Sequence, residues 1–143
     1  MTKFTKRLVV AAATLVVAAG AASAQTMKAN IPFTFRAGGA VLPAGSYRVE
    51  LSYDSASVPV LYLYGDAGHH SALARANSPH DPPKAWRANR SAMLAFQCGV
   101  SQCSLVEAWG GTERPAYGFS APRLGRNETA RVAVVALRSE KGD

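Results

Sequence analysis

The chain has 143 residues, which suits one small domain with one hydrophobic core. Its 16 Lys and Arg outnumber its nine Asp and Glu, so the formal net charge is +7. The basic residues form no stripe along the sequence, which argues against a nucleic-acid-binding protein.

The first 24 residues have the three parts of a secretory signal peptide. Basic side chains at positions 3, 6 and 7 precede the apolar run Leu8–Ala19, and Ala22–Ala24 is a small-residue cleavage site. A membrane anchor is the alternative, but this run of twelve residues is shorter than the about 20 that a spanning helix needs. We therefore expect cleavage after Ala24 and a mature chain that begins at Gln25.

Without this leader, residues 25–143 are expected to form a single β-rich domain of 119 residues. The leader holds three of the sixteen basic residues and none of the nine acidic ones, which leaves a net charge of +4. That charge attracts anionic partners only weakly. No second long apolar stretch follows, so the mature chain is expected to have no membrane span and to be soluble, in the periplasm or outside the cell.

Short runs of alternating polarity follow the leader, separated by Gly- and Pro-rich turns. This pattern predicts an all-β fold of about seven strands, either an antiparallel β-sandwich or a partly open barrel. Pro32 lacks an N–H, so the first strand is expected either at a sheet edge or to start near this residue. The third is apolar on both faces, which predicts burial on both sides. The first four strands are expected at 29–36, 46–52, 58–64 and 70–75, with a turn at 54–57.

The longest irregular segment is 77–89 (NSPHDPPKAWRAN), whose three prolines exclude a helix interior and a central strand. A loop of this length either carries a function or is an insertion. Residues 110–122 are also Gly- and Pro-rich and are expected to be a loop. The last segment, 130–138, is compatible with a strand or a helix, and its valines favour the strand.

Residues 91–98 and 103–109 predict a β-hairpin with a four-residue loop. Export to an oxidising compartment favours a disulfide between Cys98 and Cys103. The C-x4-C spacing differs from the redox motif C-x-x-C and lacks a second ligand pair for zinc. Pairing the two cysteines sets the register of the hairpin. The further expected pairs are Phe96 with Leu105, Ala95 with Val106, Leu94 with Glu107, Met93 with Ala108 and Ala92 with Trp109.

Two motifs, IPFTF at 31–35 and LPAGSYRV at 42–49, resemble a family of small exported bacterial β-rich proteins. A later strand pair matches loosely through Leu94, Phe96, Leu105 and Trp109. The resemblance covers most of the mature chain and implies export and a β fold. The family has no assigned activity, so the resemblance implies no mechanism. The two cysteines depart from the polar and aromatic residues that this family has at the hairpin tip.

Lys84, Trp86, Arg87 and Arg90 form an aromatic and basic cluster on or beside the long loop. An exposed Trp between cations suits a glycan or an anionic polymer. The alternative is that Trp86 folds back to cap the core, which is favoured by the large apolar area of an indole.

Catalytic signatures are missing from the sequence, and no cofactor is expected. The histidines are His69, His70 and His80, and two adjacent residues of a strand point to opposite faces, so no metal site is expected. Glu107 is a charge inside an apolar strand. An acid in a cleft is one interpretation, and a carboxylate that faces solvent or pairs with an arginine is the other.

Three classes of function follow from these observations. The sequence favours a non-enzymatic exported binding module whose partner is a glycan, an anionic polymer or an envelope protein. A structural subunit that docks by a strand edge, such as the strand with Pro32, is the second. A small hydrolase or metal-dependent enzyme is the third, and it requires His69, His70, His80 and Glu107 to converge.

Overall fold

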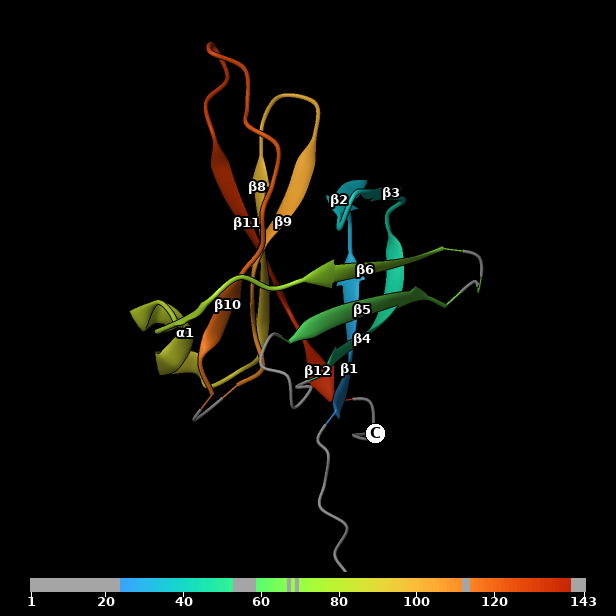
Figure 1. Cartoon of the computed structure of the whole chain (residues 1–143), viewed down its shortest axis with the longest axis vertical. Helices are drawn as coiled ribbons and strands as arrows, with labels where there is room; N and C mark the ends of the chain where they lie inside the picture. Colours follow the sequence, from blue (N-terminus) through green and yellow to red (C-terminus); the bar gives the residue numbers. More distant parts are fainter. Residues whose placement is uncertain (1–23, 53–58, 67, 69, 112–113, 140–143) are drawn as a thin grey trace, which may run out of the picture.

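The computed structural model describes residues 24–52, 59–66, 68, 70–111 and 114–139, and these fold into two packed β-sheets (Figure 1). This arrangement confirms the expected small all-β sandwich. The predicted leader up to residue 23, the predicted turn at 54–57 and His69 lie outside the described residues. Within the described part of the chain, no helix is both long and apolar enough to cross a membrane.

The first sheet has five strands in the order β12-β1-β4-β5-β6, all antiparallel. β1 pairs with β4 along its whole length, whereas β12 pairs only with Met27 and Lys28 of β1. The bounds are β1 Ala24–Ile31, β4 Gly45–Ser52, β5 Val60–Gly65, β6 Ser71–Arg75 and β12 Arg138–Ser139.

The second sheet has seven strands, five of them in the order β11-β8-β9-β10-β7. The short β2 pairs with β3 and runs parallel to the beginning of β9. The bounds are β2 Phe35–Ala37, β3 Ala40–Leu42, β7 Pro79–His80, β8 Met93–Cys98, β9 Cys103–Trp109, β10 Ala116–Gly118 and β11 Arg131–Ala136.

The chain passes directly from one sheet to the other at Pro32–Thr34 and at Leu137. Because Pro32 has no N–H to donate, it ends β1, and the chain then enters the second sheet as β2. The single strand expected at 29–36 is therefore wrong: it is two strands in different sheets. The expected edge position is wrong as well, because β1 lies between β12 and β4, and β2 lies between β3 and β9. Leu137, the one residue between β11 and β12, is buried. Its N–H donates a hydrogen bond to the carbonyl of Ala92 at 2.9 Å.

The core lies between the two sheets and follows from the alternation in the sequence. Tyr47, Val49 and Leu51 of β4 point inward together, as the period of two predicts. Phe35 packs edge-on against both Tyr47 and Phe96, with ring centroids 5.3 Å apart in each pair. These rings join the first sheet to the second, because β4 and β8 belong to different sheets.

Six of the seven strands expected from the sequence overlap one longer strand of the described residues for most of their length, and the exception is 29–36, which is divided between β1 and β2. β2, β3, β7, β10 and β12 have only two or three residues each. The preference for a strand over a helix in 130–138 is confirmed by β11, but the segment is not one strand, because Arg138 belongs to β12 of the first sheet. β5 differs from the expectation of burial on both sides. Leu61 and Leu63 are buried, but Tyr62 is half-buried and Tyr64 exposed on the outer face.

The predicted hairpin of β8 and β9 forms, but its register changes partway. Cys98 lies opposite Cys103 and Phe96 opposite Leu105, as expected. A β-bulge at Val106 then shifts the remaining pairs by one residue. The expected partners of Ala95, Leu94, Met93 and Ala92 are therefore wrong, and the observed pairs are Ala95 with Glu107, Leu94 with Ala108 and Met93 with Trp109.

The segment 77–89 is not wholly irregular, because it contains β7 and the helix α1, Lys84–Asn89. The helix begins immediately after Pro83, so the prolines precede it rather than interrupt it. It ends at Arg90, which has a left-handed φ of 58°. The loop expected at 110–122 likewise contains β10, which pairs with both β9 and β7.

Candidate functional site

The structure places the predicted cluster of Lys84, Trp86, Arg87 and Arg90 on α1 and its C-cap. Trp86 is only 7% exposed, and its ring stacks on Trp109 of β9 at a centroid distance of 6.4 Å. The indole of Trp86 is thus buried, as in the alternative interpretation, although it packs in a second apolar cluster rather than on the core between the sheets. The exposed Trp between cations that a ligand would need is not present. Lys84, Arg87 and Arg90 are exposed.

Trp86 and Trp109 belong to a second, smaller apolar cluster, separate from the core between the sheets. The cluster joins Trp86 of α1 to residues of β8, β9 and β10 whose side chains point away from the core. Figure 1 shows α1 beside β10. Trp109 Nε1 donates a hydrogen bond to the carbonyl of Arg114 at 2.7 Å, which satisfies the polar atom of the buried indole. The other members are Met93, Ala95 and Ala116, with Val106 partly buried beside them.

The hairpin tip is closed by the predicted disulfide between Cys98 and Cys103. The carboxylate of Glu128 accepts hydrogen bonds from the N–H groups of Val100 at 2.8 Å and Gly125 at 2.9 Å. These bonds lower the pKa of Glu128. Two contacts therefore stabilise the hairpin tip: the disulfide between its two strands and the hydrogen bond from Val100 to the carboxylate of Glu128.

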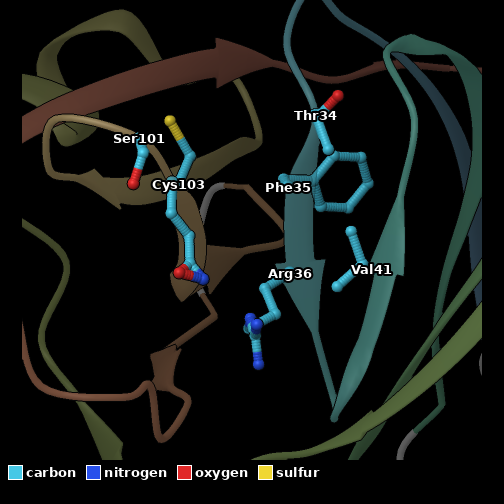
Figure 2. Close-up of a pocket in the computed structure, with 7 residues that line it drawn as sticks. Thr34, Phe35, Arg36, Val41, Ser101 and Cys103 are labelled. Atoms are coloured by element: carbon cyan, nitrogen blue, oxygen red, sulfur yellow. The ribbon is translucent and has the colours of Figure 1, made fainter.

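A pocket of about 290 Å³ lies between β2–β3 and the hairpin tip (Figure 2). Phe35 and Cys103 are buried and lie on opposite sides of the pocket, and Figure 2 shows the side chain of Arg36 below and between them. With the amide oxygen of Gln102 turned toward it, Arg36 donates from Nε at 3.0 Å and Nη2 at 3.2 Å. In that orientation Gln102 occupies two of the five N–H donors of the guanidinium.

His80 and Glu107 are brought together, with Nε2 and Oε2 2.6 Å apart. The bulge at Val106 explains the position of Glu107, because it puts two consecutive side chains on the outer side of the sheet. The partner of Glu107 is therefore a histidine rather than an arginine. His70 lies on the other sheet, just before β6. Among the described residues, no three metal-ligating side chains converge.

The feature that sequence reasoning missed is the outer face of the five-stranded sheet. Arg138 of β12 pairs with Lys28 of β1, Lys28 pairs with Arg48 of β4, and Arg48 pairs with Tyr64 of β5. Directly paired residues of neighbouring strands project to the same side. Arg138, Lys28 and Arg48 therefore form one row of cations across three strands. On the next strand, the row continues with Tyr64. We call Lys28, Arg48, Tyr62, Tyr64 and Arg138 the aromatic–basic face.

The aromatic part of this face is ordered by stacking. The rings of Tyr62 and Tyr64 are 4° from parallel with centroids 6.1 Å apart, and the Arg48 guanidinium lies 5.2 Å from the centroid of Tyr64. This cation–π contact holds Arg48 in place and leaves its N–H groups as donors. Glu50, opposite Tyr62, brings one negative charge to the same side of the sheet.

Paired like charges make the row unusual. Like charges directly opposite each other destabilise a sheet, and here Lys28 has a cation on each side. In the sequence these cations are 20 and 90 residues apart, so no local pattern links them. The sequence does contain one relevant signal, the alternation of polarity within each strand. It places Arg48 on the outer side of its strand and Tyr64 on one face of another strand, but it does not show that the two strands pair.

No family model, curated protein or solved structure shows significant similarity to this chain. The resemblance of the IPFTF and LPAGSYRV motifs to small exported bacterial proteins therefore stays a prediction.

Proposed function

We propose that this chain is a non-enzymatic, exported binding protein that holds an acidic polysaccharide on its aromatic–basic face. The observation that carries the proposal is the row Arg138, Lys28 and Arg48, in which three cations are in register across three strands. A polyanion that lies across the strands would meet all three and relieve their mutual repulsion.

The regular geometry of a sheet suits a polymer. Neighbouring strands are about 4.8 Å apart, so successive cations of the row repeat at about that spacing. A ligand with charges along a chain can use such a repeat, whereas a small anion would contact one or two of its members. The row thus favours a polymeric anion over a small one.

The tyrosines favour a sugar polymer over a simple polyanion. Tyr62 and Tyr64 are next to the cations and present phenol groups, which combine apolar surface with a hydroxyl. Aromatic surface adjoining cations suits sugar rings that carry carboxylates. An exported protein also seldom meets nucleic acid, which makes a cell-surface or extracellular polysaccharide the matching partner class.

The competing location on α1 is less suited to this task. Lys84, Arg87 and Arg90 are exposed, but Trp86 is buried against Trp109 and cannot stack on a ligand without leaving the protein. The His80–Glu107 pair supplies a hydrogen-bonded acid and imidazole but no third group that converges on it among the described residues. An enzyme is therefore not proposed.

The test is a binding titration with polygalacturonate, an acidic polysaccharide, with neutral dextran and polyphosphate as comparison probes. The double variant Lys28→Ala/Arg48→Ala should weaken binding of polygalacturonate by about tenfold or more, which corresponds to roughly 1.4 kcal/mol of lost attraction. Added salt should weaken the binding of the unaltered protein, because exposed charges are screened.

The matched control is Lys84→Ala/Arg87→Ala, which removes the same charge from α1. It should leave the affinity within about twofold of the unaltered protein. Tyr62→Ala/Tyr64→Ala should weaken binding of polygalacturonate but not of polyphosphate. Equal losses in the two charge variants would contradict the proposed location, and equal binding of dextran would contradict the requirement for an acidic ligand.

A further inference from the structure

β11, Arg131–Ala136, is the end strand of the second sheet. All six of its residues pair with β8, and the described strands include none that pairs with its other side. Six residues of strand span about 20 Å, so an edge of that length has free backbone donors and acceptors. Figure 1 shows β11 at the margin of the sheet, beyond β8.

The side chains of β11 do not protect this edge. Val132 and Val134 are 66% and 46% exposed, and no charged residue or proline occurs between Val132 and Ala136. Proteins commonly block an edge with lysine, proline, a bulge or a covering loop. Within β11, the only charge is Arg131, at its first position.

Other strand edges of the described structure are short or covered. β7 and β12 have two residues each, and β7 contains a proline. The longer β6 has the turn between β2 and β3 against its backbone, and a Cβ at Gly38 would overlap the carbonyl oxygen of Leu73. Figure 1 shows β6 between β5 and the β2–β3 pair. The fold thus covers one long edge with a turn, whereas among the described residues no strand pairs with the outer edge of β11.

We propose that β11 is a self-association edge, which pairs with β11 of a second copy of this chain in antiparallel orientation. The charge distribution selects this orientation. A parallel pair would put the two Arg131 side chains opposite each other, whereas an antiparallel pair puts them at opposite ends of the joint. The second sheets of two copies then form one continuous sheet.

Two-fold symmetry also matches the apolar side chains. Val132 and Val134 are on the same face of the strand, so a perpendicular two-fold axis brings the valines of one copy beside those of the other. The surface that one strand pair covers is smaller than that of a standard interface. The dimer is therefore expected to dissociate on dilution. This inference uses a different strand from the aromatic–basic face and does not depend on the proposed ligand.

The test is analytical ultracentrifugation over a dilution series. The protein is expressed from the full sequence, leader included, and purified from the fraction in which the host accumulates it. The unaltered protein should change from dimer to monomer as the concentration falls. Val132→Lys should raise the dissociation constant of the dimer by about tenfold or more, because it puts like charges near the joint. Leu73→Lys is the matched control: Leu73 is 51% exposed on β6, and its replacement should leave the dimer unchanged.

Amide hydrogen exchange supplies a second measurement that needs no variant. The outward N–H groups of β11 should exchange more slowly in the concentrated sample than in the dilute one, while amides of β4 should not change. A monomer at every concentration, or exchange in β11 that does not depend on concentration, would overturn the proposal. A dimer that Val132→Lys and Leu73→Lys weaken equally would also overturn it, whatever the outcome of the polysaccharide titration.

Discussion

The indole of Trp86 lies against the indole of Trp109, with the ring planes 27° from parallel. This contact closes the outer apolar cluster and fixes α1 on the β8–β9 hairpin. The two residues are 23 positions apart in the sequence, and only one of them is in a strand. The role of Trp86 is thus a packing role.

Replacing Trp86 with alanine should destabilise the fold by about 3 kcal/mol, because it removes a buried aromatic ring and leaves a cavity beside Trp109. Urea denaturation measures the loss. Trp86→Phe keeps most of the apolar contact and should cost clearly less. If Trp86→Ala left stability unchanged while reducing ligand binding, the assignment to packing would be wrong.

Removing the disulfide by Cys98→Ser/Cys103→Ser should lower stability by about 2 kcal/mol, since the bridge closes a short loop. Thermal unfolding of the unaltered protein should show the same loss of stability when a reductant breaks the disulfide. Agreement between the variant and the reduced protein would show that the effect comes from the bond rather than from the serines.

Glu128 should make the hairpin tip sensitive to acid. Its pKa is below the ordinary value of 4.5 because the folded carboxylate accepts two backbone N–H groups. A group whose pKa is lower in the folded state contributes stability above the unfolded pKa. That contribution starts to disappear as the pH falls below about 4.5 and is gone once the pH is below the lowered folded value.

The variant Glu128→Gln removes the titrating group and keeps the size of the side chain. The difference in unfolding midpoint between the unaltered protein and this variant should therefore be largest near neutral pH and shrink in acid. A difference that stays constant from pH 7 to pH 3 would contradict a role for the charged carboxylate.

Gly38 and Gly39 offer a matched pair of substitutions in one turn. Both have positive φ, 56° and 88°, so alanine strains the backbone at either position. A Cβ at Gly38 would also overlap the carbonyl oxygen of Leu73, whereas a Cβ at Gly39 meets nothing within 4 Å. Gly38→Ala should therefore destabilise by at least about 1 kcal/mol more than Gly39→Ala in chemical denaturation. Equal losses would mean that the turn does not press against β6.

Much of the fold could be read from local patterns. The alternation in 46–52 shows which side chains of β4 face the core, because a strand reverses the direction of its side chains at each residue. The cysteine spacing located the hairpin tip for the same reason, since a short loop leaves few choices of register. Both predictions depend only on residues that are neighbours in the chain.

The candidate site could not be read in this way. The aromatic–basic face takes its residues from four strands, and Lys28 and Arg138 meet only because β12 pairs with β1. The bulge at Val106 and the burial of Trp86 are also decided by packing against distant segments.

By itself, the sequence determined the all-β class, most of the long strands and the position of the disulfide, because these follow from local polarity and spacing. Only the tertiary structure decided which strands lie side by side, which cations form a row and which edge stays open. Those relationships are set by pairing and packing between segments far apart in the chain, and no local pattern contains them.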